Sequence, residues 1–99
     1  HDVSVAGVRK LPGQAFIVDG TVTIRDLNRE FEWGLPDKEY STLAGLVIYE
    51  SQRIPDAGQS FIFYGFRFDV LKKVRNQITK IRVSPPNAGV PAHFQAGVE

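Results

Sequence analysis

Apolar residues in the first half of the chain recur at the three-to-four-residue spacing of a helix. Ile24, Leu27 and Phe31 lie on one face at this spacing, and Thr23 precedes them with Asp26 three positions later, as in a capping box. The pattern predicts a short amphipathic helix from about Ile24 to Glu32. Gly34 and Pro36 then end it, because neither residue continues a helix well.

A second helix is predicted after this loop. Ser41 can cap its amino end, since its hydroxyl oxygen can accept a hydrogen bond from a free backbone N–H of the first turn. Four residues of the helix then share one face, three of them apolar: Leu43, Leu46, Val47 and Glu50. The loop over residues 53–58 follows, because it contains Pro55 and Gly58.

Strands are predicted on both sides of the helical part. Residues 15–18 are short, β-branched and aromatic, and Asp19 and Gly20 close them with turn residues, so they form the first strand. From Ser60 to Val83 the apolar residues alternate with polar ones, which is the pattern of half-buried strands.

A two-residue turn at Tyr64 and Gly65 would pair Phe63 with Phe66 and Phe61 with Phe68. This register places four phenylalanine rings on one face, which must therefore be buried. A positive φ angle is costly for Tyr64, by roughly 1 kcal/mol.

A second two-residue turn, at Asn76 and Gln77, would pair Arg75 with Ile78, Lys73 with Lys80 and Leu71 with Arg82. Leu71 and Ile78 would then lie on the outer face. The residues that this register places beside the phenylalanines are Val70, Val74, Thr79, Ile81 and Val83.

The element order β-α-α-β-β-β predicts an α+β fold with an antiparallel sheet and both helices packed on one face, since the helices carry the only other apolar stripes. We divide the chain into a lead-in at 1–14, a domain at 15–85 and a flexible tail at 86–99, where Pro85, Pro86 and Pro91 disfavour regular structure.

Composition narrows the classes of function. Among the 99 residues, 12 Lys and Arg stand against 11 Asp and Glu, so no strong overall field favours nucleic acid or a membrane surface. The chain contains no cysteine, which excludes disulfides and thiolate chemistry, and no apolar run reaches the roughly 20 residues needed to span a bilayer.

No catalytic or metal site emerges from the candidate residues. His1 and His93 are at opposite ends of the chain, and Ser41 and Thr42 lack a base to activate them. The carboxylates lack the spacing of a calcium loop and are expected to be surface groups and caps: Asp19, Asp26, Asp37, Glu39 and Asp56. We expect a protein that is not an enzyme and holds no metal.

A cluster of cations on the outer face of the predicted sheet is the strongest candidate contact surface. It consists of Arg67, Lys73, Arg75, Lys80 and Arg82, with only Asp69 opposing them. Such a cluster could attract an acidic protein, a lipid headgroup or a nucleotide phosphate. It could also be an ordinary solvated face, because exposed strands of antiparallel sheets usually carry charge.

Several segments in order resemble the CorC/HlyC transporter-associated domain. They are Asp26-Leu27-Asn28, Leu35-Pro36-Asp37, the run from Tyr40 to Leu46, Arg53-Ile54-Pro55, Gly58 and the run from Gly65 to Leu71, within a match from about Phe16 to Ser84. Tyr64 departs from the pattern, since members of that family usually place Asp, Asn or another turn former there.

This resemblance implies a cytoplasmic module at the carboxyl end of a membrane protein, after a membrane-embedded segment and a pair of CBS domains. Proteins of this kind are described as hemolysins or as magnesium and cobalt efflux factors. The implied role is regulation of ion transport through contacts with the parent chain, with a homodimer left open. The fold is also similar to part of flavin-dependent oxidases, which leaves FAD or an adenine nucleotide open as a ligand and gives the alternative of a small-ligand binding domain.

Overall fold

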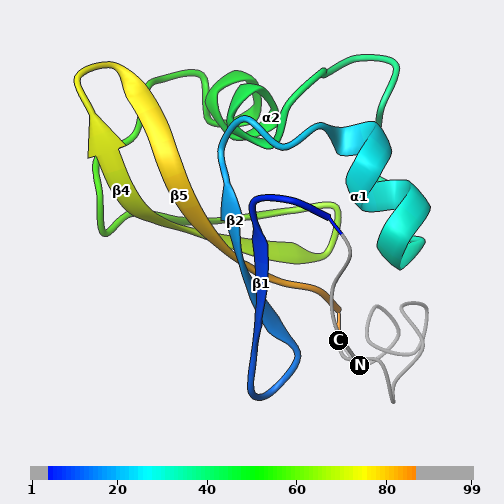
Figure 1. The fold of residues 1–99 in the computed structure, drawn as a ribbon. Coiled ribbons are helices and arrows are strands. Elements are labelled where there is room, and N and C mark those ends of the chain that lie inside the picture. Colours follow the sequence, from blue (N-terminus) through cyan, green and yellow to red (C-terminus); the bar gives the residue numbers. More distant parts are fainter. Residues whose placement is uncertain (1–4, 87–99) are drawn as a thin grey trace, which may run out of the picture.

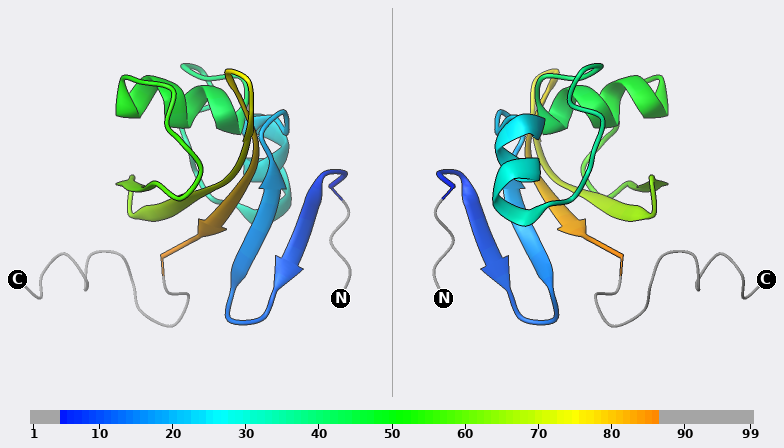
Figure 2. Two further views of the ribbon diagram at one scale, coloured as in Figure 1. Left: turned by 90° about the vertical axis from the view of Figure 1, so that its left-hand side faces the viewer. Right: turned by 90° about the vertical axis from the view of Figure 1, so that its right-hand side faces the viewer.

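The computed structural model describes residues 5–86, which form a five-stranded antiparallel sheet with two helices on one of its faces (Figure 1). In chain order the elements are β1 (Val8–Leu11), β2 (Ala15–Asp19), α1 (Ile24–Phe31), α2 (Leu43–Ser51), β3 (Ser60–Phe63), β4 (Phe66–Val74) and β5 (Gln77–Ser84). The strand order in the sheet is β1-β2-β5-β4-β3. The predicted α+β class and the helices on one face are confirmed, as two opposite views, each turned by 90° from Figure 1, show (Figure 2).

Strand β1 is missing from the prediction, which left residues 1–14 without a regular element. It pairs with β2 in antiparallel register, from Val8 opposite Val18 to Leu11 opposite Ala15. Only the two end residues of β1 are partly buried, while Arg9 and Lys10 between them are exposed. The two-residue alternation that marks a strand is therefore absent from its sequence. Residues 1–4 and the predicted tail from residue 87 onward lie outside the described residues.

Helix α1 begins as predicted. The Thr23 hydroxyl accepts a hydrogen bond from the Asp26 backbone N–H at 3.1 Å, and Ile24 and Leu27 are buried beneath the helix. The residue that ends the helix in a left-handed conformation is Glu32, with φ of 57°, and not a glycine. Asn28 then fixes the following loop, because its side chain exchanges two hydrogen bonds of 2.7 and 2.8 Å with the backbone of Leu35.

Helix α2 is capped by Thr42, so the predicted cap at Ser41 is wrong by one residue. The Thr42 hydroxyl accepts a hydrogen bond from the Gly45 N–H at 3.1 Å, while the carbonyl of Ser41 accepts one from the N–H of Ile24. This second bond ties the start of α1 to the start of α2. The predicted apolar face is confirmed, since Leu43, Leu46 and Val47 are all buried.

The hairpin of β3 and β4 has the predicted turn and register. Phe63 faces Phe66 and Phe61 faces Phe68, and both turn residues, Tyr64 and Gly65, have positive φ. The four phenylalanine rings lie on the helix side, where Phe66 and Phe68 are buried and the other two are partly buried against the core. The hydrophobic alternation and the glycine were therefore sufficient to set this register.

The hairpin of β4 and β5 differs from its prediction. Val74 faces Gln77, so the turn residues are Arg75 and Asn76, and Asp69 rather than Leu71 faces Arg82. The ladder is also irregular on both strands: β4 has an extra residue at Leu71, and β5 has one at Thr79. Such an extra residue reverses the side on which the following side chains lie.

This double irregularity exchanges the faces near the turn. Ile78, predicted on the outer face, is only 3% exposed and belongs to the core. Val74, predicted beside the phenylalanines, is 49% exposed. Near the β4–β5 turn, β5 therefore contributes Ile78 to the core, and β4 contributes no buried residue. Lys73 of β4 lies on the helix side, where its Nζ contacts Asp56 Oδ1 at 2.7 Å.

Gly20 is the point at which β2, β5 and α2 meet. Its N–H donates to the Thr79 carbonyl at 3.1 Å, and its own carbonyl accepts from the Ala44 N–H at 3.0 Å. A Cβ atom added to Gly20 would lie 2.0 Å from the carbonyl oxygen of Ile78. The fold therefore requires a glycine at this position because backbone packs directly against it.

Candidate functional site

The outer face of the sheet, opposite the helices, is covered by no other element among residues 5–86 (Figure 2). The strand register sets a row of residues across it, in the order Arg9, Ile17, Arg82, Asp69 and Ser60. Every strand contributes one residue to this row. Charged side chains from segments far apart in the sequence are thereby brought next to one another.

The structure brings together three of the five predicted contact residues. Arg67, Lys80 and Arg82 lie on the outer face. Lys73 and Arg75 do not join them, because the irregular ladder directs Lys73 toward Asp56 and places Arg75 in the turn with φ of 57°. Whether these residues bind anything stays a prediction.

Asp69 holds two of the cations in place. Its Oδ1 accepts a hydrogen bond from Arg67 Nε at 2.9 Å and another from the Ser60 hydroxyl, and its Oδ2 accepts one from Arg82 Nε at 3.1 Å. Asp69 is 6% exposed. Burial alone raises the pKa of its carboxyl, but these three hydrogen bonds outweigh burial, and the pKa lies below its ordinary value.

Near β1 the outer face is hollowed into an open cavity of about 540 Å³. Ile17 and Leu71 provide apolar lining, and Arg9, Lys72 and Lys80 bring positive charge to its walls. Lys80 is paired with Asp19, whereas no ion pair within residues 5–86 involves Arg9 or Lys72.

Sequence analysis missed Arg9 and Lys72. Arg9 could be placed only once β1 is known to pair with β2, and Lys72 reaches the outer face only because of the extra residue at Leu71. A single signal was available in the sequence, which is the pair of adjacent cations at Arg9 and Lys10 in front of a turn.

Charge is strongly segregated between the two layers of the fold. The segments that form the sheet, 5–19 and 60–86, contain eight Lys and Arg against two Asp, a net charge of +6. The segment 20–59, which contains both helices, has four Lys and Arg against seven Asp and Glu, a net charge of −3. The near-zero total therefore conceals a positive sheet and a negative helical layer.

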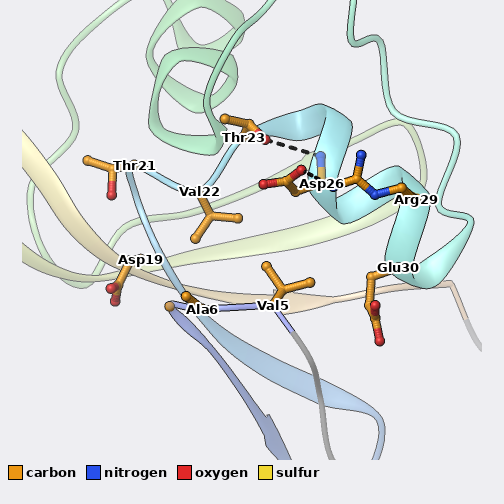
Figure 3. A pocket seen from close by; sticks show the side chains of 10 residues that line it. Val5, Ala6, Asp19, Thr21, Val22, Thr23, Asp26, Arg29 and Glu30 are labelled. Carbon is orange, nitrogen blue, oxygen red and sulfur yellow. Dashed lines mark hydrogen bonds and ion pairs between the residues drawn. The ribbon is translucent and has the colours of Figure 1, made fainter.

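A second open cavity, of about 500 Å³, lies between residues 5–7, the end of β2 and α1 (Figure 3). Its carboxylates come from Asp19, Asp26 and Glu30. Asp26 is engaged with Arg29 at 2.5 Å, and Asp19 with Lys80. Within residues 5–86 no three His, Cys, Asp or Glu side chains are grouped so that they could hold a metal ion.

A cluster of two tyrosines and one carboxylate joins α2 to the β3–β4 turn. Glu50 Oε2 accepts hydrogen bonds of 2.5 Å from the hydroxyls of both Tyr40 and Tyr64. The bond to Glu50 is the main cause that raises the pKa of each tyrosine, and the two bonds lower the pKa of Glu50. Tyr64 has a positive φ of 58°, which favours smaller turn formers. Its hydrogen bond to Glu50 offsets part of this backbone cost and gives a reason for a tyrosine at this position.

Residues 9–87 match the protein family described as the Transporter associated domain, CorC_HlyC. The chain belongs to this family. This CorC/HlyC domain is 32% identical over 69 residues to the inner membrane protein YfjD of Escherichia coli, a match that covers 70% of the chain and 16% of YfjD. It is 25% identical over 95 residues to the magnesium and cobalt efflux protein CorC of Buchnera aphidicola, which covers 96% of the chain and 33% of CorC.

A solved structure supports the same family. The CorC_HlyC domain of a Xylella fastidiosa hemolysin, in complex with Mg²⁺ and Mn²⁺, superposes with a TM-score of 0.70 at 28% identity, over 83% of this chain and all of that one. The matched region of the chain spans a third or less of the length of YfjD and of the Buchnera CorC. No helix within residues 5–86 has the length and apolar character needed to cross a membrane.

Proposed function

We propose that this domain is a non-enzymatic regulatory module on the cytoplasmic side of a CorC/hemolysin-like membrane protein, where it modulates ion transport through contacts with the rest of the parent chain. The names of its relatives support this role, since one is an inner membrane protein and another is a magnesium and cobalt efflux protein. The domain makes up a minor part of each, as expected for a module that acts on a larger transport unit.

The observation that carries the proposal is the uncovered outer face with its unpaired cations. Arg9 and Lys72 flank an apolar hollow, and the strands around them hold most of the positive charge of the chain. A face of this kind suits an acidic partner, because complementary charge speeds association and fixes orientation. The partner that fits is an acidic surface of the parent, for which the family resemblance suggests the CBS pair.

A non-enzymatic role agrees with the chemistry of the described residues. Residues 5–86 contain neither His nor Cys, and the hydroxyl of Thr42 is engaged in capping α2. The carboxylates of Asp19, Asp26 and Asp69 are each engaged by a Lys or Arg. The carboxylates that accept hydrogen bonds from hydroxyl groups are Asp69, bonded to Ser60, and Glu50, bonded to two tyrosines. Both carboxylates have a lowered pKa, which makes them weak bases for activating a nucleophile.

The test is a charge reversal in the intact parent protein. Arg9→Glu with Lys72→Glu should change the ion-transport response in the same direction as removal of residues 9–86, because both changes abolish the same contact. The matched control is Lys38→Glu with Arg53→Glu, which changes the net charge equally in the helical segment, at two exposed residues. The proposal fails if the reversed protein transports like the wild type while the deletion does not.

The alternative of a nucleotide or flavin ligand can be separated by thermal shift of the isolated domain. We expect no change in melting temperature with Mg²⁺, Co²⁺, adenine nucleotides or FAD. A ligand present at about 100 times its dissociation constant would stabilise the domain by roughly 2.7 kcal/mol. If a ligand raises the melting temperature of the wild type and not of the Arg9→Glu, Lys72→Glu variant, the outer face is a ligand site and the proposed protein contact is wrong.

A further inference from the structure

Strand β3 lies at one edge of the sheet and pairs only with β4. In a hairpin closed by a two-residue turn, the pairs Phe63–Phe66 and Phe61–Phe68 are the ones that exchange backbone hydrogen bonds. The N–H and C=O groups of Ile62, which lies between them, therefore point away from β4. This edge can accept another strand.

The edge carries no charged residue, proline or bulge to prevent strand pairing, although β3 is only four residues long. Residues Ser60–Phe63 contain no charge and no proline, and the side chain of Ile62 is 70% exposed. Edge strands are commonly protected by charged residues, proline or a bulge. The opposite edge is protected in this way, because β1 carries Arg9 and Lys10 at its centre.

The sequence of β3 reads the same in both directions around Ile62, as Phe61-Ile62-Phe63. We propose that β3 pairs antiparallel with β3 of a second copy of this chain, across a two-fold axis at Ile62. Ile62 then faces Ile62 of the second copy, and Phe61 faces Phe63. Pairing across a two-fold axis sets each strand against its own sequence, so all three residues at the centre of this interface face apolar residues.

The register suits both faces of the extended sheet. Phe61 and Phe63 are stacked on the helix side, with ring centroids 5.7 Å apart, and are only partly buried. Phenylalanines of the second copy would lie directly across from them, and aromatic cross-strand pairs stabilise antiparallel strands. On the outer face no like charges oppose each other across the axis, because β3 is uncharged and Arg67 on β4 is paired with Asp69.

The absence of cysteine in the chain permits a clean crosslinking test. The variant Ile62→Cys should form a disulfide-linked dimer under mild oxidation, since facing residues of antiparallel strands have Cα atoms roughly 5.5 Å apart and disulfides span about 4.4–6.8 Å. The control is Val74→Cys, an exposed residue at the far end of β4. We expect the Ile62→Cys variant to crosslink to at least roughly ten times the extent of the control, a ratio set by specific pairing rather than collision.

Sedimentation equilibrium of the isolated domain provides a second measurement. The wild type should show a concentration-dependent dimer, and Ile62→Lys should weaken it by roughly tenfold or more. The melting temperature should stay near that of the wild type, because the Ile62 side chain is exposed and contributes little to the core.

Two results would overturn the proposal. One is a wild-type domain that remains monomeric at about 1 mM, where even weak specific association is visible, together with equal crosslinking of the two cysteine variants. The other is a monomeric isolated domain together with altered ion transport when Ile62→Lys is introduced into the parent protein. That result would assign the edge of β3 to a strand from elsewhere in the parent. Sedimentation and crosslinking do not depend on transport, so this inference can fail while the proposed function holds.

Discussion

Replacing Gly20 by alanine tests the packing at the junction of β2, β5 and α2. The added Cβ atom would lie 2.0 Å from the Ile78 carbonyl oxygen and 3.1 Å from the Ala44 Cβ. Ordinary carbon–oxygen contacts in proteins are roughly 3.3–3.6 Å, so the backbone of β5 must move by about 1.3 Å. No side-chain rotation relieves this contact, because the obstructing atom belongs to the backbone.

The expected cost is large for a domain of this size. Overpacking a core costs about 1–3 kcal/mol, and the upper end applies here because the hydrogen bonds from Gly20 to Thr79 and from Ala44 to Gly20 are strained as well. Domains of 60–100 residues lose about 4–8 °C of melting temperature per kcal/mol, so a loss of about 3 kcal/mol lowers the melting temperature by roughly 12–24 °C.

Urea unfolding followed by circular dichroism measures this change directly, with Gly13→Ala as the matched control. Gly13 has a positive φ of 78° but no atom within 4 Å of an added Cβ. The control should therefore cost only about 1 kcal/mol of backbone strain. A Gly20→Ala domain that is destabilised no more than the Gly13→Ala domain would refute the close approach of β5 to Gly20.

Three further predictions address single hydrogen-bonded groups. The pKa of Asp69 is lowered in the folded state, so the stability that its carboxylate provides is present above the unfolded pKa of about 3.9 and is lost as the pH falls through the folded pKa. Asp69→Asn should lower the free energy of unfolding by about 1–3 kcal/mol at pH 7. The same variant should lose less stability than the wild type when the pH is lowered, as measured by unfolding at a series of pH values. Thr42→Ala should cost about 1 kcal/mol in urea unfolding, whereas Ser41→Ala should cost clearly less, because only Thr42 caps α2. The hydrogen bond to Glu50 raises the pKa of Tyr64, so the stability from this bond is present below about pH 10 and is lost as the pH rises through the folded pKa. Tyr64→Phe should remove one phenol that ionises at high pH from an ultraviolet titration. The variant should also lose less stability than the wild type when the pH is raised.

The parts of the fold that were predictable from sequence have a regular local pattern. The buried faces of α1 and α2 follow from helical spacing, and the β3–β4 hairpin follows from alternating phenylalanines around Gly65. The β4–β5 hairpin was not predictable in the same way, because two extra residues on opposite strands restore the register beyond them and leave no break in the sequence pattern. Asn76 is a turn former, yet the positive φ falls on Arg75 beside it.

The candidate contact surface was predictable only where the strands are regular. Arg67, Lys80 and Arg82 lie on the outer face because alternation holds in those parts of β4 and β5. Lys73 was misplaced by the irregular ladder, and Arg9 was missed with the whole of β1. Cross-strand neighbours depend on pairing between distant segments, which periodicity within one segment does not encode.

The segregation of charge makes the domain an electric dipole, with a net charge of +3 over residues 5–86. Its sheet segments carry +6 and its helical segment −3, and the two layers lie on opposite sides of the core. A charged body that approaches such a molecule first exerts a torque, which turns the sheet toward negative charge before any contact forms. This alignment acts over about 8 Å at physiological ionic strength, so added salt should slow productive encounters more than it weakens a contact already made.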